Sequence, residues 1–398
     1  MASVRSVYVH VPFCSHRCGY CNFTLLAGRD DLVPSYLDAV EREFKRYLSA
    51  PLPVDTLFLG GGTPSFLPPD QLQELLELIG RWFLPGDNLE YSCEVNPIDC
   101  QPEKLRLLRE AGVNRISLGG QSFSKRKLKL LERDHSPEEL RTAVQRCHSF
   151  FDRVSLDLIF ATPDETLEEW KADLDSATSL DLRHLSTYGL TIESGSAFFS
   201  RLRRGELEEL DNTLQGDLYE LTIEHMTSQG WTHYEVSNFA NNSLGTEEHC
   251  RHNEAYWLGK YWWGFGPGAA SFLPVEALSR EAQPEAAEDF AFRSTNHPST
   301  MKYIRRLQHE DSPKQNHESV NQEQYIRERL VFGLRRLQGV HLETLAREVG
   351  ENVEGYFQPY LKNYLDQGWL ERAPDGYLRL TRRGLLISDA MWPDLLVG

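Results

Sequence analysis

Short runs of β-branched and aromatic residues alternate with helix-period segments over the first two-thirds of the chain. The short runs predict strands, and the segments between them predict helices. The strand candidates are Ser6–Val11, Thr56–Gly60, Tyr91–Val95, Asn114–Leu118, Arg153–Phe160 and His184–Thr191. The helix candidates are Val33–Leu48, Pro69–Trp82, Pro102–Ala111, Pro137–Phe150 and Leu167–Leu180. Repeated strand–helix units indicate an α/β fold with a parallel sheet covered by helices. Six such units favour a partial or open barrel over a two-domain dinucleotide fold.

The pattern changes after Phe272. Residues 276–321 are polar and rich in Pro, Gln, Glu and Ser, which predicts a connector with short helices. A compact unit follows, with expected helices at Tyr325–Leu337, Leu342–Val349, Val353–Gln367 and Thr381–Ala390. A short hairpin is expected at Leu370–Leu380, before the last of these helices. Helices with a small hairpin resemble a winged-helix arrangement. We therefore expect a partial (β/α)6 barrel domain over 1–275, a connector over 276–321, and a small, mostly helical, winged-helix-like domain over 322–398.

Residues with chemical potential follow the predicted strands at their carboxyl ends. The cysteine-rich stretch Cys14–Cys21 follows the first strand, and the glycine run at Gly60–Ser65 follows the second. Glu94 ends the third strand, Gln121 follows the fourth, and Asp157 lies within the fifth. Since the carboxyl ends of parallel strands carry the chemistry of such folds, we expect these residues on one face.

Three of the seven cysteines, Cys14, Cys18 and Cys21, fall within eight residues. Thiolates are the ligands that iron–sulfur clusters require. Zinc would need a fourth ligand, for which His16 stands awkwardly between two cysteines. Three protein ligands on a [4Fe–4S] cluster leave one iron open to an outside ligand. The plainer alternatives are a structural zinc or a chance grouping.

The segment around these cysteines, YVHVPFCSHRCGYCNF at 8–23, resembles the signature of the radical S-adenosylmethionine (SAM) superfamily. More narrowly, it resembles the branch that holds oxygen-independent coproporphyrinogen dehydrogenases and HemW-type heme chaperones. The resemblance continues through GGGTPS at 60–65, EVNP at 94–97, GVNRISLGGQSF at 112–123, DLI at 157–159, YEVSNF at 234–239 and CRHN at 250–253.

The resemblance implies a cofactor site. It implies that SAM chelates the open iron and that the reduced cluster cleaves it to methionine and a 5′-deoxyadenosyl radical. The positions that it assigns to SAM are Gly61, Gly62, Thr63, Glu94, Gln121, Arg133 and Asp157. It also places Tyr8 near the cofactor, and Tyr20 could lie along the adenine or the cluster. Taken singly, these residues would more often be turn, capping, surface or core residues.

A second polar group consists of Glu235, Asn238, Cys250, His252 and Asn253. Cysteine and histidine are both axial ligands of heme iron, so Cys250 and His252 are heme-ligand candidates. The alternative is a hydrogen-bonded loop packed over the cluster face.

Several departures from the family pattern bear on function. In the dehydrogenases a fourth cysteine stands two positions after the third, where this chain has Phe23, and a longer arm precedes the cluster. Both features favour a heme chaperone that delivers heme to an acceptor protein. Glu132 stands where the family usually has glycine, and Ala270 where the subgroup often has histidine. The alternatives are an oxygen-independent coproporphyrinogen III dehydrogenase or related radical SAM enzyme, and an electron-transfer or structural iron–sulfur protein.

Composition narrows the partners. A net charge of −17 argues against nucleic acid, and the chain has no apolar run long enough to span a membrane. Seven cysteines without a secretory signal suit a reducing compartment, so a cytoplasmic location is expected. The expected partners are heme or another tetrapyrrole, a heme-acceptor protein and an electron donor.

Overall fold

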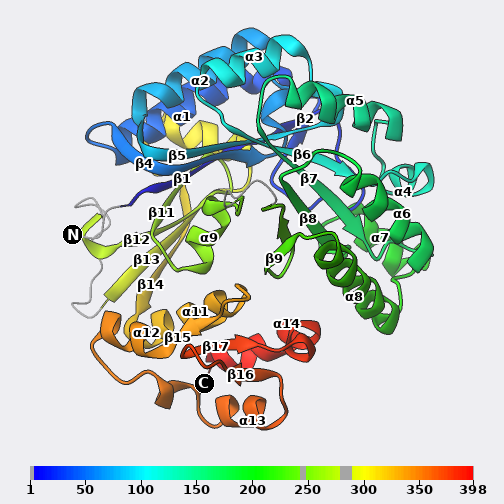
Figure 1. Ribbon diagram of the computed structural model, residues 1–398. Coiled ribbons are helices and arrows are strands. Elements are labelled where there is room, and N and C mark those ends of the chain that lie inside the picture. Colours follow the sequence, from blue (N-terminus) through cyan, green and yellow to red (C-terminus); the bar gives the residue numbers. More distant parts are fainter. Residues whose placement is uncertain (1–3, 243–247, 278–288, 398) are drawn as a thin grey trace.

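The computed structural model describes residues 4–242, 248–277 and 289–397. Its main element is a curved twelve-stranded sheet with the strand order β14-β13-β12-β11-β1-β4-β5-β6-β7-β8-β10-β9 (Figure 1). The seven central strands from β11 to β8 are parallel to one another. Antiparallel strands extend the sheet on both sides. The predicted α/β fold with a partial barrel is confirmed.

The six expected strands are adjacent in the barrel. They are β1 (Ser6–Val11), β4 (Leu52–Gly61), β5 (Phe83–Val95), β6 (Arg115–Gln121), β7 (Arg153–Phe160) and β8 (His184–Gly189). Most helices of this half lie on the outer, convex face in Figure 1, whereas the short helix Ala197–Arg203 packs on the loop that contains the clustered cysteines. They are α1 (Val33–Tyr47), α2 (Pro69–Trp82), α3 (Pro102–Glu110), α4 (Lys125–Leu130), α5 (Pro137–His148), α6 (Leu167–Thr178), α7 (Ala197–Arg203) and α8 (Asn212–Ser228).

Local sequence explains where these helices begin. α5 starts with a capping box, in which the Ser136 hydroxyl accepts from the Glu139 N–H at 3.2 Å and the Glu139 carboxylate accepts from the Ser136 N–H at 2.7 Å. α2 and α3 both have proline in the first turn, where a missing N–H costs no intrahelical bond.

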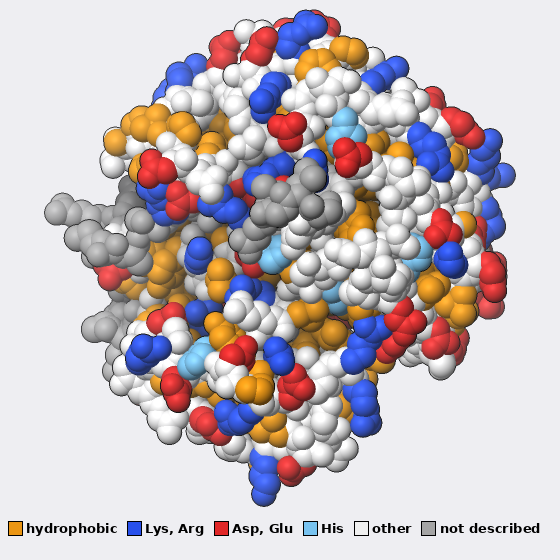
Figure 2. Space-filling model, in the orientation of Figure 1, with side chains coloured by type: hydrophobic (Ala, Val, Ile, Leu, Met, Phe, Trp, Pro, Cys, Tyr) orange, Lys and Arg blue, Asp and Glu red, His pale blue; other side chains and the backbone are white. Residues whose placement is uncertain are grey.

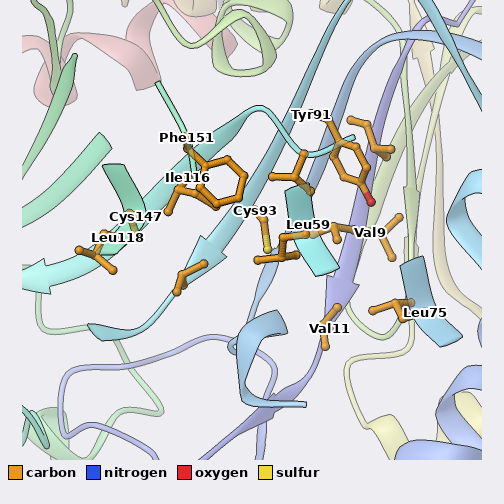
Figure 3. Packing of buried hydrophobic residues seen from close by; sticks show 14 of the residues in the cluster. Val9, Val11, Leu59, Leu75, Tyr91, Cys93, Ile116, Leu118, Cys147 and Phe151 are labelled. Atoms are coloured by element: carbon orange, nitrogen blue, oxygen red, sulfur yellow. The ribbon is translucent and has the colours of Figure 1, made fainter. Parts of the chain in front are cut away.

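The core lies between the sheet and these outer helices (Figure 3). Val9 of β1, Leu59 of β4 and Ile116 of β6 are fully buried, and they meet Leu75 of α2 and Cys147 of α5 in the same cluster. Each such apolar side chain contributes about 1.5–3 kcal/mol when removed from water. Packing on the convex side leaves the strand ends and the concave side for polar residues.

The expected connector is more structured than its composition suggests. Residues 289–321 contain β13 (Asp289–Asn296), α10 (Thr300–Gln308) and β14 (Lys314–Asn321), and both strands join the main sheet. The expected short helix is present as α10, but the two strands were not predicted. β14 is an outermost strand with mostly exposed side chains, so its sequence is polar and lacks the apolar pattern of a strand. The part of the connector at 278–288 lies outside the described residues.

The remaining strands and α9 surround the concave side. They are β2 (Phe13–Cys14), β3 (Leu26–Ala27), β9 (Thr232–Glu235), β10 (Asn238–Ala240), β11 (Trp262–Phe265), β12 (Ala270–Pro274) and α9 (Arg251–Trp257). β2 and β3 pair with each other. They close residues 14–25, the cysteine loop, which contains the three clustered cysteines.

The C-terminal unit has its own hydrophobic cluster and a three-stranded sheet. Its elements are α11 (Gln322–Leu334), β15 (Val340–His341), α12 (Leu342–Val349), α13 (Tyr360–Asp366), β16 (Leu370–Arg372), β17 (Tyr377–Leu380) and α14 (Arg382–Val397). The single helix expected over Val353–Gln367 is instead split into a 3-10 turn at Glu354–Phe357 and α13. Pro359 explains the break because it lacks the N–H that a continuous helix would use.

Candidate functional site

The three clustered cysteines line one cavity of about 660 Å³ at the carboxyl ends of the barrel strands. Cys14 and Cys18 are buried, Cys21 is partly exposed, and all three are free thiols. A turn closed by the Cys21 N–H and the Cys18 carbonyl at 3.0 Å brings the last two together. Burial raises the pKa of the Cys18 and Cys21 thiols, so neither ionises readily without a cation to stabilise the thiolate.

Most of the residues that the sequence nominated come together in this cavity. Besides the cysteines, its lining includes Tyr20, Gly61, Gly62, Thr63, Glu94, Gln121, Arg133 and Asp157. These residues come from the carboxyl ends of β4 to β7 and from the segments that follow β1 and α4. The expectation of one shared face agrees with this arrangement.

The glycine loop has no space for a side chain at Gly61 or Gly62. Gly61 has φ of +111°, and a Cβ there would lie 2.4 Å from the His10 ring. A Cβ on Gly62 would lie 2.5 Å from the Phe13 carbonyl oxygen. Only glycine tolerates both the positive φ and these close approaches.

Glu94 is held directly above this loop. Its carboxylate accepts from the Gly61 N–H at 2.9 Å. Desolvation by burial raises the pKa of Glu94 to about 7, with a further contribution from the negative charge of Asp157. Burial also raises the pKa of Asp157, whose carboxylate accepts from the Ser117 hydroxyl at 3.2 Å. Two partly buried carboxylates with raised pKa values favour a ligand that brings positive charge or hydroxyl donors.

Arg133 connects the cysteine loop to the strand ends. Its guanidinium donates to Cys18 Sγ at 3.4 Å and to Asn96 Oδ1 at 2.8 Å, while its Nε has no hydrogen-bond partner in the described part of the chain. Asn96 in turn donates to Thr63 Oγ1 at 3.0 Å, and that hydroxyl lies 3.3 Å from Cys14 Sγ. The sequence pattern gives Asn96 no role of its own, although the EVNP motif at 94–97 contains it.

Tyr8 faces a second, neighbouring cavity of about 570 Å³. This aromatic cavity is lined by Tyr8, His10, Phe23, Thr24, Tyr256, Trp257, Trp262, Ala270, Phe332 and a few adjoining residues. The two cavities share Asn22 and Phe23, immediately after Cys21. Phe332 of α11 brings the C-terminal unit into this wall. Charged side chains of both signs are interspersed over the face of the molecule in Figure 2.

Cys250 and His252 line neither of these two cavities. Both are buried at the start of α9. The His252 ring has a partner at each nitrogen, with Thr56 Oγ1 at 3.0 Å and the Tyr256 hydroxyl at 2.8 Å. Burial lowers the pKa of His252 to about 3 and raises that of Cys250 to about 12. The His252 ring and the Cys250 thiol are therefore packed inside the fold. Tyr256, which lines the aromatic cavity, lies against His252.

Three cysteine thiols are a donor set that fits an iron–sulfur cluster. Within 4–242, 248–277 and 289–397, no three His, Cys, Asp or Glu side chains converge on one metal position. Separate irons of an iron–sulfur cluster each take their own thiolate, so such convergence is not required. In the same residues, every helix is too short or too polar to cross a bilayer.

Comparison with known proteins supplies the context for this geometry. The model of the radical SAM superfamily matches residues 8–177, which implies a [4Fe–4S] cluster and SAM, and the model of the HemN C-terminal domain matches residues 320–387. The structure of coproporphyrinogen III oxidase (HemN) from Escherichia coli has the same fold, with a TM-score of 0.82 at 21% identity, over 100% of this chain and 91% of that one.

Full-length relatives are closer in sequence. The heme chaperone HemW of Bacillus subtilis is 32% identical over 393 residues, which cover 98% of each protein. HemW of Mycobacterium tuberculosis is 35% identical over 397 residues, covering 98% of this chain and 94% of the relative. On this sequence similarity, together with the cysteine-lined cavity, the chain belongs to the HemW heme chaperone family of the radical SAM superfamily.

Proposed function

We propose that this protein is a heme chaperone that binds a [4Fe–4S] cluster, SAM and heme, and transfers the heme to an acceptor protein. The observation that carries the proposal is the pair of adjoining cavities, one lined by three cysteines and the other walled by aromatic side chains. Their volumes lie in the range of roughly 300–1,000 Å³ typical of small-molecule and cofactor sites. Membership of the HemW family supports the same reading.

The cluster is held by Cys14, Cys18 and Cys21, one cluster per chain, with Arg133 beside the Cys18 thiol to stabilise its ionised form. When bound, a [4Fe–4S] cluster supplies one-electron reduction to the ligand on its open iron. Because Cys14 and Cys18 are buried, little of their own surface is in contact with bulk water.

SAM occupies the rest of the cysteine-lined cavity. Its ammonium group donates hydrogen bonds, so carbonyl oxygens of the Gly61–Thr63 loop receive it, since the Gly61 N–H already serves Glu94. Glu94 and Asp157 accept from ribose hydroxyls, and Gln121 and Tyr20 border the same space. Arg133 borders the same space, and its guanidinium is the cationic group that pairs with the methionyl carboxylate.

A pH dependence of SAM binding tests the role of Glu94. Because its pKa is raised to about 7 by burial, Glu94 is mostly protonated below that pH in the ligand-free protein. A cationic sulfonium ligand favours the ionised carboxylate, so binding releases a proton and affinity rises with pH. We expect an increase of about tenfold between pH 6 and pH 8, measured by anaerobic calorimetry. Glu94→Gln should remove this increase, and an equal pH dependence in the variant would contradict the assignment.

Heme occupies the aromatic cavity. Tyr256, Trp257 and Trp262 offer flat apolar faces for a porphyrin, and Phe332 adds one from α11. Ala270, which stands where the subgroup often has histidine, leaves room in the wall. His10 also borders this cavity, but its Nδ1 contacts the Tyr8 hydroxyl at 3.0 Å and its Nε2 contacts the Thr24 carbonyl at 2.6 Å. Heme ligation by His10 would therefore require one of these bonds to break.

Filling the aromatic cavity should block heme. We expect Ala270→Trp to weaken hemin binding at least about tenfold, because the added ring takes the space of the ligand or overpacks the wall. Titration with hemin, followed at the Soret band, measures this. Leu84→Trp adds a ring at an exposed position that lines neither cavity and should leave binding unchanged. Iron content and SAM binding should stay normal in both variants.

The chaperone function itself is tested by transfer. Reconstituted protein loaded with one hemin should pass it to a heme-free b-type cytochrome and should leave coproporphyrinogen III unchanged in the presence of SAM and reductant. Consumption of coproporphyrinogen with release of carbon dioxide would instead identify a decarboxylating enzyme and overturn the proposal.

A further inference from the structure

Glu132 adopts a backbone conformation that most residues avoid. It has φ of +56°, in the left-handed region where glycine is favoured and where the family pattern has glycine. Its side chain forms an ion pair with Arg201 of α7, and the two side chains are only about one-third exposed. A strained backbone persists only where surrounding contacts hold it in place. The ion pair with Arg201 is a contact of this kind.

α7 packs directly on the cysteine loop. The Phe198 N–H donates to the Gly19 carbonyl at 2.8 Å, between Cys18 and Cys21. A Cβ on Gly19 would lie 2.2 Å from the Phe198 ring and 3.1 Å from the Glu132 carboxylate. The Arg201 guanidinium lies 5.5 Å from the centre of the same buried Phe198 ring. Glu132, Phe198 and Arg201 thus enclose one residue of the loop.

The backbone around Glu132 contacts the other half of the loop. The Glu132 carbonyl accepts from His16 Nε2 at 2.6 Å, and the next-but-one residue, Asp134, accepts from the Ser15 hydroxyl at 3.2 Å. Residues 132–134 therefore touch the loop on one side while α7 covers it on another. The Glu132–Arg201 ion pair is the side-chain link between these two supports.

We propose that Glu132 and Arg201 are positioning residues that fasten α7 against the cysteine loop and so slow the loss of the bound cluster. This inference rests on the proposed function, in that Cys14, Cys18 and Cys21 hold the cluster. The two side chains of the pair have no described contact with the thiols or with the side chains assigned to SAM, and their effect passes through Gly19 and Phe198. A partly exposed ion pair of this kind changes an equilibrium by a factor of about two to five.

The experiment measures the decay of cluster absorbance in air for reconstituted proteins. Glu132→Gln and Arg201→Gln should each lose the cluster about two- to fivefold faster than the unaltered protein, and the charge-swapped double variant E132R/R201E should recover most of the difference. The matched control is Glu206→Gln, which removes an exposed ion pair with Arg204 just after α7 and should change nothing.

Glu132→Gly separates the ion pair from the backbone. This variant removes the backbone strain of the left-handed conformation, and it also removes the carboxylate that pairs with Arg201. If the ion pair holds α7 against the loop, this variant should lose the cluster faster. Cluster loss as slow as, or slower than, that of the unaltered protein would overturn the proposal, as would equal loss in all the variants. Trypsin should also cut iron-free Glu132→Gln near α7 about two- to fivefold faster, with an unchanged melting temperature. Failure of the unaltered protein to take up iron would contradict the proposed function instead.

Discussion

A protein in which Cys14, Cys18 and Cys21 are all replaced by alanine should take up almost no iron or sulfide on anaerobic reconstitution. The unaltered protein should take up about four of each, the content of one [4Fe–4S] cluster. Among the residues that the structure describes, the lining of this cavity contains no soft ligands other than these three thiols. The visible absorbance of the cluster should be lost together with the metal.

Cys147→Ala is the matched control for this experiment. Cys147 is a fully buried free cysteine of α5 that packs in the core, 3.7 Å from Cys100 Sγ, and lines neither cavity. Its replacement removes a thiol of similar burial and should leave the iron content unchanged. Full iron in the triple variant would show that the metal sits elsewhere and would contradict both the cluster assignment and the function built on it.

Gly61→Val should abolish SAM binding while the cluster is retained. A Cβ at this residue meets the His10 ring at 2.4 Å, and His10 cannot easily move because Tyr8 and Thr24 hold both of its ring nitrogens. The positive φ of +111° is also closed to a β-branched residue. The loop must therefore shift and lose its hydrogen bond to Glu94. We expect SAM affinity to fall by about a hundredfold or more, measured by anaerobic calorimetry.

Gly80→Val provides the comparison. Gly80 is an exposed residue within α2, a Cβ there meets nothing within 4 Å, and its φ is ordinary. It should bind SAM normally, since valine is tolerated in a helix better than glycine. Circular dichroism and iron content confirm that each variant is folded and loaded. Normal SAM affinity in Gly61→Val, with the cluster present, would remove the glycine loop from the binding site.

Much of the barrel follows from local sequence. The boundaries of β1, β7 and α2 agree with the pattern of apolar residues, because strand and helix periodicities are properties of neighbouring positions. The same holds for the carboxyl-end placement of the cysteine loop and of Glu94, because parallel strands joined by helices must all point the same way.

Long-range contacts decided what local patterns could not. The polar segment 289–321 joins the main sheet because β13 pairs with β12. It also completes a buried network in which Glu43 accepts from the Gly266 N–H at 2.8 Å and from the Tyr303 hydroxyl at 2.5 Å. Nothing in the spacing of residues 43, 266 and 303 indicates that they meet.

The chain's sequence alone predicts the ligand chemistry that we propose, since three thiols within eight residues and a glycine run after a strand indicate it by residue type and spacing. The tertiary structure decided the division into two cavities, because their walls combine β1, the cysteine loop, α9 and α11 from more than 300 residues of chain. It also turned Tyr8 towards the aromatic cavity and placed Cys250 and His252 inside the packing. Side-chain direction depends on which distant elements are in contact, and no local pattern records that.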